Sequence, residues 1–219
     1  PRYYIVPNSI LIVGDNSIVK QLIYSLMFQN FEPKNIVLVE GTKINDYSLD
    51  FLNKFNIIFL VRDSMDENSI GKLREYAAQG GLIVPNILTG QNSVSNEDIN
   101  VIFNKTTGNY TEIKINEYSN NKVVLELNDE KGWLVASERF AYFPGWTAEI
   151  DGKFVDMFRA NNAVTALYIN GEKGKLVFEY KPSSYGTGRI ISVMSFIAII
   201  FYFGYFLYKK KPIGDQNQN

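Results

Sequence analysis

The first half of the chain alternates short apolar runs with amphipathic stretches. Uninterrupted apolar runs, typical of strands buried on both faces of a parallel sheet, occupy residues 9–15, 35–41, 56–63 and 81–87. After the first run, apolar pairs recur every four residues from Ile18 to Met27, which predicts a helix. A second helix is predicted after residue 63, with Ser64 and Glu67 as a capping box and Gly80-Gly81 as its end. This order predicts a doubly wound open α/β sheet over about residues 8–100.

The second half changes to an alternation of polar and apolar residues with a period of two. Residues 111–119 and 122–129 follow this pattern and are joined at Asn120-Asn121. Similar short segments continue to residue 182, and Asp151-Gly152 is a strong signal for a hairpin turn. Six or seven short strands at this spacing predict an all-β sandwich that follows the α/β sheet.

One segment near the C-terminus fits a membrane helix. Residues 190–208 carry no charge and, as a helix, would extend about 28 Å, close to the hydrocarbon thickness of a bilayer. Lys209–Lys211 lie at one end and a lone Arg189 at the other, which favours a cytoplasmic C-terminus. The bulk of the chain is then expected outside the plasma membrane. On that side Asn104 and Asn109 fit the N-glycosylation pattern.

These patterns divide the chain into four predicted segments. An α/β domain is expected at residues 1–105 and a membrane-proximal β-sandwich at 106–186. The transmembrane helix is expected at 187–209 and a cytoplasmic tail at 210–219. Because the sequence starts at Pro1, we also expect it to be a processed or excised piece.

Composition excludes most catalytic chemistry. The 219 residues contain no cysteine and no histidine, so a thiol nucleophile, a Ser-His-Asp triad and a His- or Cys-based metal site are impossible on this chain alone. We expect no cofactor and no metal. The net charge of −1 comes without a basic stripe, which argues against nucleic acid as a partner. A hydrolase that uses only carboxylates, such as Asp15 or Asp63 with Glu40, is the one enzymatic alternative.

Polar residues at the carboxyl ends of the predicted parallel strands form one candidate site. Ligands of such sheets bind at that edge, and Asp15 and Arg62 lie there, with Arg62 able to hold an anion. Alternatively, Asp15 caps the following helix and the charges are solvated. The stretch VGDNS lacks the G-x-G-x-x-G pattern, so nothing indicates a dinucleotide.

The stretch FAYFPGWTAEIDGK, residues 140–153, is the second candidate site, and three interpretations remain open. Trp146 could fill the corner of the sandwich, with Tyr142 or Phe143 beside it. It could instead stack on a sugar, with Glu138, Arg139, Arg159 or Asn161 bonding the hydroxyls. The aromatic residues could also contact lipid headgroups.

Two resemblances to known families follow from longer motifs. Residues 55–86, an apolar strand, an acidic helix start and a Gly-Gly stop, resemble the class I glutamine-amidotransferase-like fold, which is flavodoxin-like. Active members use a cysteine and a histidine. Both are absent here, so the resemblance, which covers about eighty residues, implies a degenerate, non-catalytic copy.

Residues 138–182 resemble the C-terminal extracytoplasmic domain of YfhO-type membrane proteins. The shared elements, in order, are Glu138, Tyr142, Pro144-Gly145-Trp146, Asp151-Gly152-Lys153, Arg159-Ala160-Asn161 and Tyr180-Lys181-Pro182, ahead of a last membrane helix. The family resembles polytopic GT-C-like glycosyltransferases whose catalytic acids lie on loops between amino-terminal membrane helices. The resemblance therefore implies an envelope or glycan context but brings no catalytic residue to this sequence.

Together these observations predict a non-catalytic extracytoplasmic module on one membrane span, which binds or scaffolds a protein or glycan partner. The candidate binding residues are Tyr142, Trp146, Arg159, Asn161, Arg62 and Asp15. The alternative is the exported C-terminal part of a YfhO-like glycosyltransferase that positions the acceptor.

Overall fold

The computed structural model describes residues 2–28, 35–61, 65–84 and 108–209, which fall into two compact units. The first unit is Pro1–Tyr180 and the second is Lys181–Asn219. The first half of unit 1 contains β1 (Tyr3–Val6), β2 (Asn8–Gly14), α1 (Asn16–Phe28), β3 (Ile36–Gly41), η1 (Ile44–Asp46), α2 (Leu49–Leu52), β4 (Ile57–Val61), α3 (Glu67–Ala78) and β5 (Leu82–Val84). The second half contains β6 (Thr111–Glu112), β7 (Ile115–Tyr118), β8 (Lys122–Asn128), β9 (Lys131–Ala136), η2 (Phe140–Tyr142), β10 (Trp146–Ile150), β11 (Lys153–Val155), β12 (Phe158–Ala160), β13 (Val164–Asn170) and β14 (Lys173–Tyr180).

The strands of unit 1 form two sheets. A nine-stranded sheet has the order β5-β4-β2-β3-β12-β13-β9-β1-β6, and a five-stranded sheet has the order β11-β10-β14-β8-β7. The strands β5, β4, β2 and β3 are parallel, as their continuous apolar runs predict. At β3 the ladder changes to antiparallel, where Val39 pairs with Ala160 of β12. The nine-stranded sheet is therefore mixed, and it contains strands from both halves of the chain.

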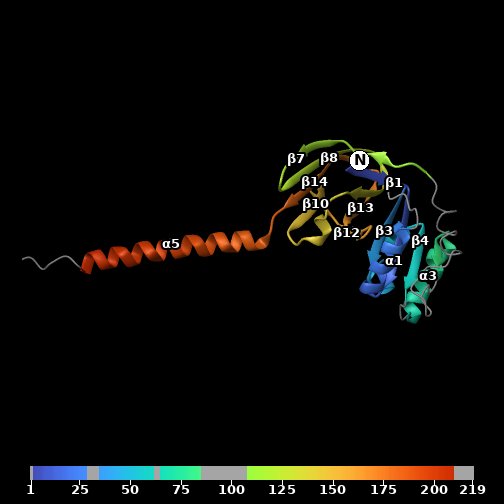
Figure 1. Ribbon diagram of the computed structural model, residues 1–219, viewed down its shortest axis with the longest axis horizontal. Helices are drawn as coiled ribbons and strands as arrows, with labels where there is room; N and C mark the ends of the chain where they lie inside the picture. The colour runs from blue at the N-terminus through green and yellow to red at the C-terminus, as the bar shows by residue number, and fades with distance from the viewer. Residues whose placement is uncertain (1, 29–34, 62–64, 85–107, 210–219) are drawn as a thin grey trace, which may run out of the picture. The chain divides into compact units, whose positions relative to one another are not determined.

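One face of the nine-stranded sheet is covered by two different layers. Over the parallel strands lies α1, whose Leu22 and Ile23 pack against Ile10 and Ile12 of β2. Over the antiparallel strands lies the five-stranded sheet, and apolar side chains such as Leu134 and Phe178 fill the space between the two sheets. Figure 1 shows β7, β8, β10 and β14 at one end of the unit and α1 and α3 at the other. Two sheets therefore pack face to face, as in the predicted sandwich, but one of them also contains strands of the first half.

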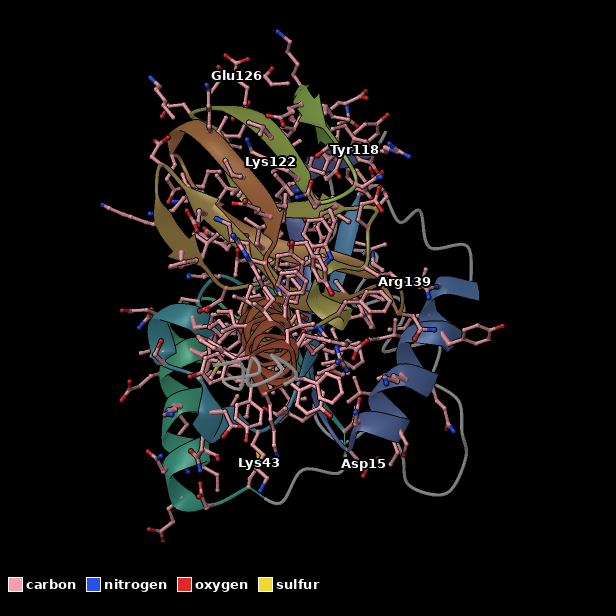
Figure 2. All side chains as sticks on the ribbon, turned by 90° about the vertical axis from the view of Figure 1, so that its left-hand side faces the viewer. Asp15, Lys43, Tyr118, Lys122, Glu126 and Arg139 are labelled. Atoms are coloured by element: carbon pink, nitrogen blue, oxygen red, sulfur yellow. The ribbon has the colours of Figure 1, made fainter. Side chains whose placement is uncertain are left out.

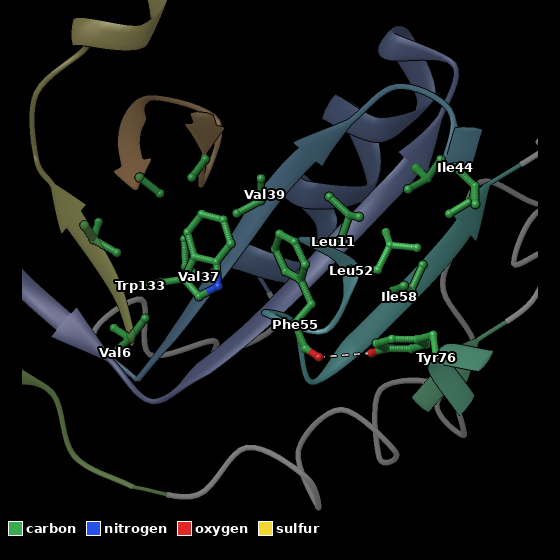
Figure 3. Packing of buried hydrophobic residues seen from close by; sticks show 14 of the residues in the cluster. Val6, Leu11, Val37, Val39, Ile44, Leu52, Phe55, Ile58, Tyr76 and Trp133 are labelled. Carbon is green, nitrogen blue, oxygen red and sulfur yellow. Dashed lines mark hydrogen bonds between the residues drawn. The ribbon is translucent and has the colours of Figure 1, made fainter. Parts of the chain in front are cut away.

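The opposite face carries one core that extends across both halves of the sheet. Leu11, Val37 and Val39 of the parallel strands share this core with Trp133 of β9, and Phe55 lies beside them (Figure 3). The indole Nε1 of Trp133 donates a hydrogen bond to the carbonyl oxygen of Lys54 at 2.9 Å, so its polar atom is satisfied. The parallel and antiparallel strands are thus packed together and not only linked along the chain.

The same core includes residues from the helices beyond it. The hydroxyl of buried Tyr76, on α3, donates to the carbonyl oxygen of Phe55 at 3.1 Å. Leu52 of α2 and Ile44 of η1 are also fully buried there. The sequence patterns predict neither α2 nor β1, whereas they predict α1 and α3.

The cap of α3 differs from the predicted one. Asp66 is the N-cap, because its Oδ1 accepts from the backbone N–H of Ser69 at 2.8 Å. Glu67 is therefore the first residue of the helix and not the third, so the predicted capping box with Ser64 as N-cap was wrong about where the helix begins. Ser64 itself lies outside the described residues. At the other end, Gly80 has a φ of 93°, a conformation that glycine adopts most readily, and the helix ends just before it as predicted.

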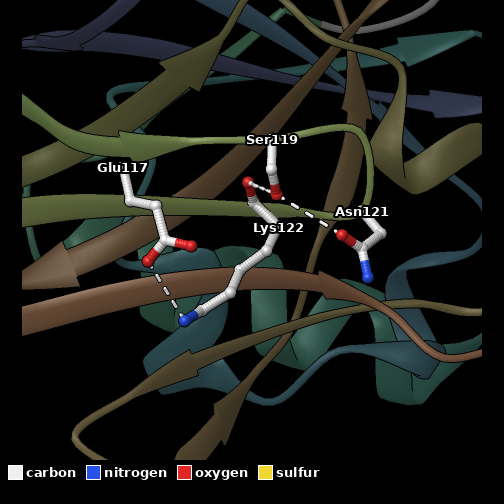
Figure 4. A network of polar contacts seen from close by, with 4 residues as sticks. All are labelled: Glu117, Ser119, Asn121 and Lys122. Atoms are coloured by element: carbon white, nitrogen blue, oxygen red, sulfur yellow. Dashed lines mark hydrogen bonds and ion pairs between the residues drawn. The ribbon is translucent and has the colours of Figure 1, made fainter.

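The turns predicted in the second half lie between paired strands. Asp151 and Gly152, with φ of 46° and 80°, connect β10 to β11 in the conformation of a two-residue hairpin. The segment between β7 and β8 is held by Ser119, whose hydroxyl donates to Asn121 Oδ1 and to the Lys122 carbonyl, while Lys122 Nζ lies 3.2 Å from Glu117 Oε2 (Figure 4).

The second unit contains the helix α5 (Ser183–Lys209). It has 27 residues, which corresponds to about 40 Å, and none of its side chains is buried in the structure. It is the one helix among the described residues that is long and apolar enough to cross a membrane. A helix with exposed apolar side chains on every face is not stable in water, and these features indicate membrane anchoring.

The predicted domain limits fall partly outside the structure. The boundary between residues 105 and 106 and the tail 210–219 both lie outside the described residues. The division into an α/β domain and a β-sandwich domain therefore stays a prediction, while the strands of both halves share one sheet.

Candidate binding cleft around Trp146

The aromatic stretch that follows β9 forms a short 3₁₀ turn, η2, and then enters β10. Phe140 of η2 is 6% exposed and belongs to the core between the two sheets. The ring of Trp146, at the start of β10, is half-buried, with its centroid 4.3 Å from that of Phe140 and 5.5 Å from that of Tyr180. Phe140 thus fills the corner of the sandwich, and Trp146 covers it from outside with part of its own ring accessible.

A cleft of about 440 Å³ lies beside these rings, and we name it the Trp146 cleft. Its lining comes from residues 140–144 and 146–148 on one side and from residues 154–157 and Arg159 on the other. Three of the predicted binding residues, Tyr142, Trp146 and Arg159, are brought together here. Two phenylalanines that also line the cleft are open to solvent, Phe143 at 57% and Phe154 at 74%. The volume falls within the range of small-molecule sites, about 300–1,000 Å³.

Tyr142 and Arg159 form one connected group at the edge of this cleft. The guanidinium carbon of Arg159 lies 4.9 Å from the centre of the Tyr142 ring, a cation–π contact. The hydroxyl of Tyr142 donates to Glu40 Oε1, on β3, at 3.1 Å. Burial, and then the negative charge and hydrogen bond of Glu40, raise the pKa of Tyr142, so it stays protonated. Arg159 is exposed and its charge is available to a ligand.

Asn161 has a structural environment and does not line the Trp146 cleft. Its side chain is buried, and its Oδ1 accepts from the backbone N–H of Leu38 at 2.8 Å. Its own N–H donates to the carbonyl oxygen of Leu38 at 2.9 Å. We name the contacts of β3 with this region the β3 joint, which pairs Leu38 with Asn161, Val39 with Ala160 and Glu40 with Tyr142.

Glu138 and Arg139, the other predicted partners of a sugar, line a neighbouring hollow of about 580 Å³ together with Phe140, Phe143 and Trp146. Glu138 Oε1 accepts a hydrogen bond from the hydroxyl of Tyr118 at 3.0 Å. The carboxylate of Glu138 therefore has fewer acceptor positions left for a ligand. Phe140, Phe143 and Trp146 therefore separate two hollows, and Glu138 and Arg139 do not face the same one as Arg159.

The candidate residues of the first half lie apart from this cleft. Asp15 is exposed at the beginning of α1 (Figure 2), where its Oδ1 accepts from the backbone N–H of Ser17 at 2.9 Å. Hydrogen bonds from the hydroxyl and N–H of Ser17 lower the pKa of Asp15, as expected for a helix cap. Arg62 and Asp63 lie outside the described residues, as does Asn104. Asn109 is described and exposed.

Within the described ranges, no group of three or more acidic side chains could hold a metal ion. The residue that the sequence analysis missed is Phe154. The sequence feature that could have identified it is its position, two residues after the Asp151-Gly152 turn on the short strand β11. Side chains of a strand alternate between its two faces, so an aromatic residue at this position can face solvent.

The comparisons with known proteins concern this same part of the chain. Residues 100–192 match the family model described as the bacterial membrane protein YfhO. The match confirms the resemblance read from residues 138–182 and covers less than half of the chain. It includes the whole second half of unit 1 and the beginning of α5. No curated protein matches the chain. The resemblance of the first half to amidotransferase-like proteins stays a prediction.

Proposed function

We propose that this chain, whose residues 100–192 are a YfhO-type membrane protein domain, is a membrane-anchored module of the cell envelope that binds a glycan in the Trp146 cleft. The observation that carries the proposal is the cleft itself. It combines accessible aromatic rings with an exposed guanidinium in the part of the chain that matches a membrane protein family. That the module is non-catalytic rests on the absence of histidine and cysteine from the sequence.

The chemistry of the cleft fits a sugar because a sugar ring has two kinds of surface. Its apolar C–H faces pack on aromatic rings, and Trp146, Phe143 and Phe154 offer such rings at the cleft. Its hydroxyls need donors and acceptors, which Arg159 and Asp156 supply at the lining. A purely hydrocarbon ligand would leave these two charged groups without a role in binding.

The anchor is α5, with the bulk of the chain on the outer side. The positive charges favour this direction, since Lys209–Lys211 follow the apolar segment and only Arg189 precedes it. The outward placement is part of the proposal, and it is required for an envelope glycan to reach the cleft.

A second candidate function follows from the family match. In this version the chain is the exported C-terminal part of a YfhO-like polytopic glycosyltransferase, and the cleft positions the acceptor for chemistry on other membrane loops. The two candidates differ in the gene that encodes the chain. Several membrane spans encoded upstream would favour the glycosyltransferase, and a cleaved signal peptide would favour the independent module.

We extend the proposal to the fold of the first half. The parallel order β3-β2-β4-β5, with α1 on one face and α3 on the other, supports a doubly wound α/β domain of the flavodoxin-like type. Its proposed role is to stabilise the cleft, because the β3 joint holds Tyr142 through Glu40.

The binding proposal is tested with the full chain in lipid nanodiscs on an array of neutral and charged oligosaccharides. Phe143→Ala and Arg159→Ala change exposed residues of the cleft, so both variants should fold normally. We expect each to weaken binding about tenfold, as for one lost stacking or hydrogen-bond contact. Tyr24→Ala is the matched control, because Tyr24 is a 54% exposed aromatic on α1 and lines neither hollow beside Trp146. Equal binding by all variants would refute the proposal.

The orientation is tested separately by thiol labelling. Because the chain has no cysteine, Lys131→Cys introduces a single thiol at an exposed position of unit 1. An impermeant maleimide added to intact cells should label this variant and should fail to label Gln216→Cys. The reverse labelling pattern would place unit 1 in the cytoplasm and would contradict an envelope function.

A further inference from the structure

A second cleft of about 530 Å³ lies between the region of α2 and the strands β11 to β13. We name it the α2 cleft, and its lining includes Asp50, Phe51, Lys54, Phe154, Asp156 and Tyr168. Residues 154–156 line both this cleft and the Trp146 cleft. The two clefts therefore meet at the short segment that begins with Phe154, which is the most exposed aromatic side chain among the described residues of unit 1.

Aromatic rings form one wall of the α2 cleft. The centroid of Phe51 lies 5.0 Å from that of Phe158, and behind them the ring of Trp133 lies 5.6 Å from that of Tyr168. The rings that line the cleft, those of Phe51, Phe158 and Tyr168, are half-buried. Trp133, which packs behind them in the core, is 2% exposed. The wall is consequently packed against the core, and its half-buried rings leave part of their surface open to the cleft.

The polar groups of the α2 cleft include both signs of charge. The ammonium of Lys54 lies 5.0 Å from the centre of the Tyr168 ring and 5.6 Å from that of Phe51. Among the described residues, none of the ion pairs involves Lys54. Asp50, Asp156 and Glu172 add three carboxylates to the lining.

This combination limits the class of ligand. An anion would be repelled by three carboxylates that face a single ammonium. An organic cation would compete with Lys54, which already occupies the ring faces. A neutral hydroxyl accepts from an ammonium and donates to a carboxylate, so a polyhydroxylated neutral ligand can use both. The ring wall then takes the apolar face of the same ligand.

We propose that the α2 cleft is a second saccharide subsite, and that a neutral linear oligosaccharide lies across Phe154 with one end in each cleft. This proposal rests on glycan binding in the Trp146 cleft and extends it to a ligand of defined class and length. Phe154 is the aromatic residue shared by the two subsites, Arg159 belongs to the first subsite, and Asp50 and Lys54 belong to the second.

The test compares disaccharides with longer linear oligosaccharides of the same linkage, using the full chain in nanodiscs. We expect the longer ligands to bind about tenfold more tightly, because they fill both subsites. Asp50→Ala and Lys54→Met should remove this gain and leave the affinity for disaccharides unchanged. Lys54→Met keeps an apolar side chain beside the rings, and Asp50 is exposed, so neither change should unfold the protein. Phe154→Ala should weaken binding of the longer ligands most, and Tyr24→Ala should bind as the unchanged chain does.

A second readout uses the two tryptophans of the sequence. In Trp146→Phe the remaining Trp133 lies behind the wall of the α2 cleft, so longer oligosaccharides should change its fluorescence and disaccharides should not. If affinity does not increase with length, or if Asp50→Ala and Lys54→Met bind longer ligands normally, the second subsite is refuted while the Trp146 cleft can still stand. If only the Asp50 and Lys54 variants lose binding and Arg159→Ala does not, the second cleft binds sugar and the proposed function at Trp146 fails. If no saccharide binds, both are refuted.

Discussion

Replacing Asn161 by glycine tests whether the β3 joint stabilises the fold. Asn161 has a φ of 44°, which glycine adopts without strain, so the change leaves the local backbone free to keep its conformation. What it removes is the buried Oδ1 that accepts from the N–H of Leu38 at 2.8 Å. Asn162→Gly is the matched control, because Asn162 has a similar φ of 62° and is half-buried. Its side chain is not one of the contacts that make up the β3 joint.

The expected loss follows from the group that is left without a partner. A buried N–H that loses its acceptor costs about 1–3 kcal/mol. The extra chain entropy of glycine in the unfolded state, about 0.5–1 kcal/mol, applies equally to both variants and cancels in their comparison. We therefore expect Asn161→Gly to be less stable than Asn162→Gly by about 1–3 kcal/mol.

Urea unfolding of the full chain in nanodiscs, followed by tryptophan fluorescence, measures this difference. Amide hydrogen exchange supplies a local readout, since the N–H of Leu38 should exchange faster in Asn161→Gly only. If the two glycine variants unfold at the same urea concentration, or if Leu38 keeps its protection, the bond between the two halves of the chain contributes nothing and the reasoning is wrong.

Three further changes have expected outcomes. Trp133→Ala should lower the free energy of unfolding by about 3–5 kcal/mol in thermal denaturation, because it empties a fully buried site. Tyr142→Phe should cost about 1–2 kcal/mol in the same scan through the lost bond to Glu40. Hydrogen bonds from Ser69 lower the pKa of the Asp66 carboxylate in the folded protein. The carboxylate therefore stabilises the fold fully above its ordinary pKa of about 3.9, and this contribution is lost as the pH falls below that value. The difference in Tm between Asp66→Ala and the unchanged chain should accordingly shrink from pH 7 to pH 3.

Local patterns predicted the elements that depend on local physics. The parallel strands could be found because each is a continuous apolar run buried on both faces, and α1 because its apolar pairs repeat with the helical period. By contrast, the pairing of β1 with a strand of the second half could not be predicted. Its four residues pair with β9, more than a hundred positions away, and nothing in the letters YYIV identifies that partner.

The candidate site was predicted to a similar extent. Tyr142, Trp146 and Arg159 were named from the sequence, and they do line one cleft. The sequence could not show that Asn161, unlike these three residues, is buried and does not line the cleft. Its role depends on a hydrogen bond with Leu38, 123 positions away. The α2 cleft was not predicted for the same reason, since its walls come from α2 and β13, two segments that only the completed sheet brings together.

The connection between the two units has a mechanical consequence. Only Lys181 and Pro182 separate the last residue of β14 from the first residue of α5, so any tension on the bilayer anchor is transmitted directly to β14. That strand is central in its sheet, with β8 on one side and β10 on the other. Removing β14 from the sheet would therefore break the hydrogen bonds of both ladders. The membrane anchor is therefore attached to a strand that is hydrogen-bonded on both sides.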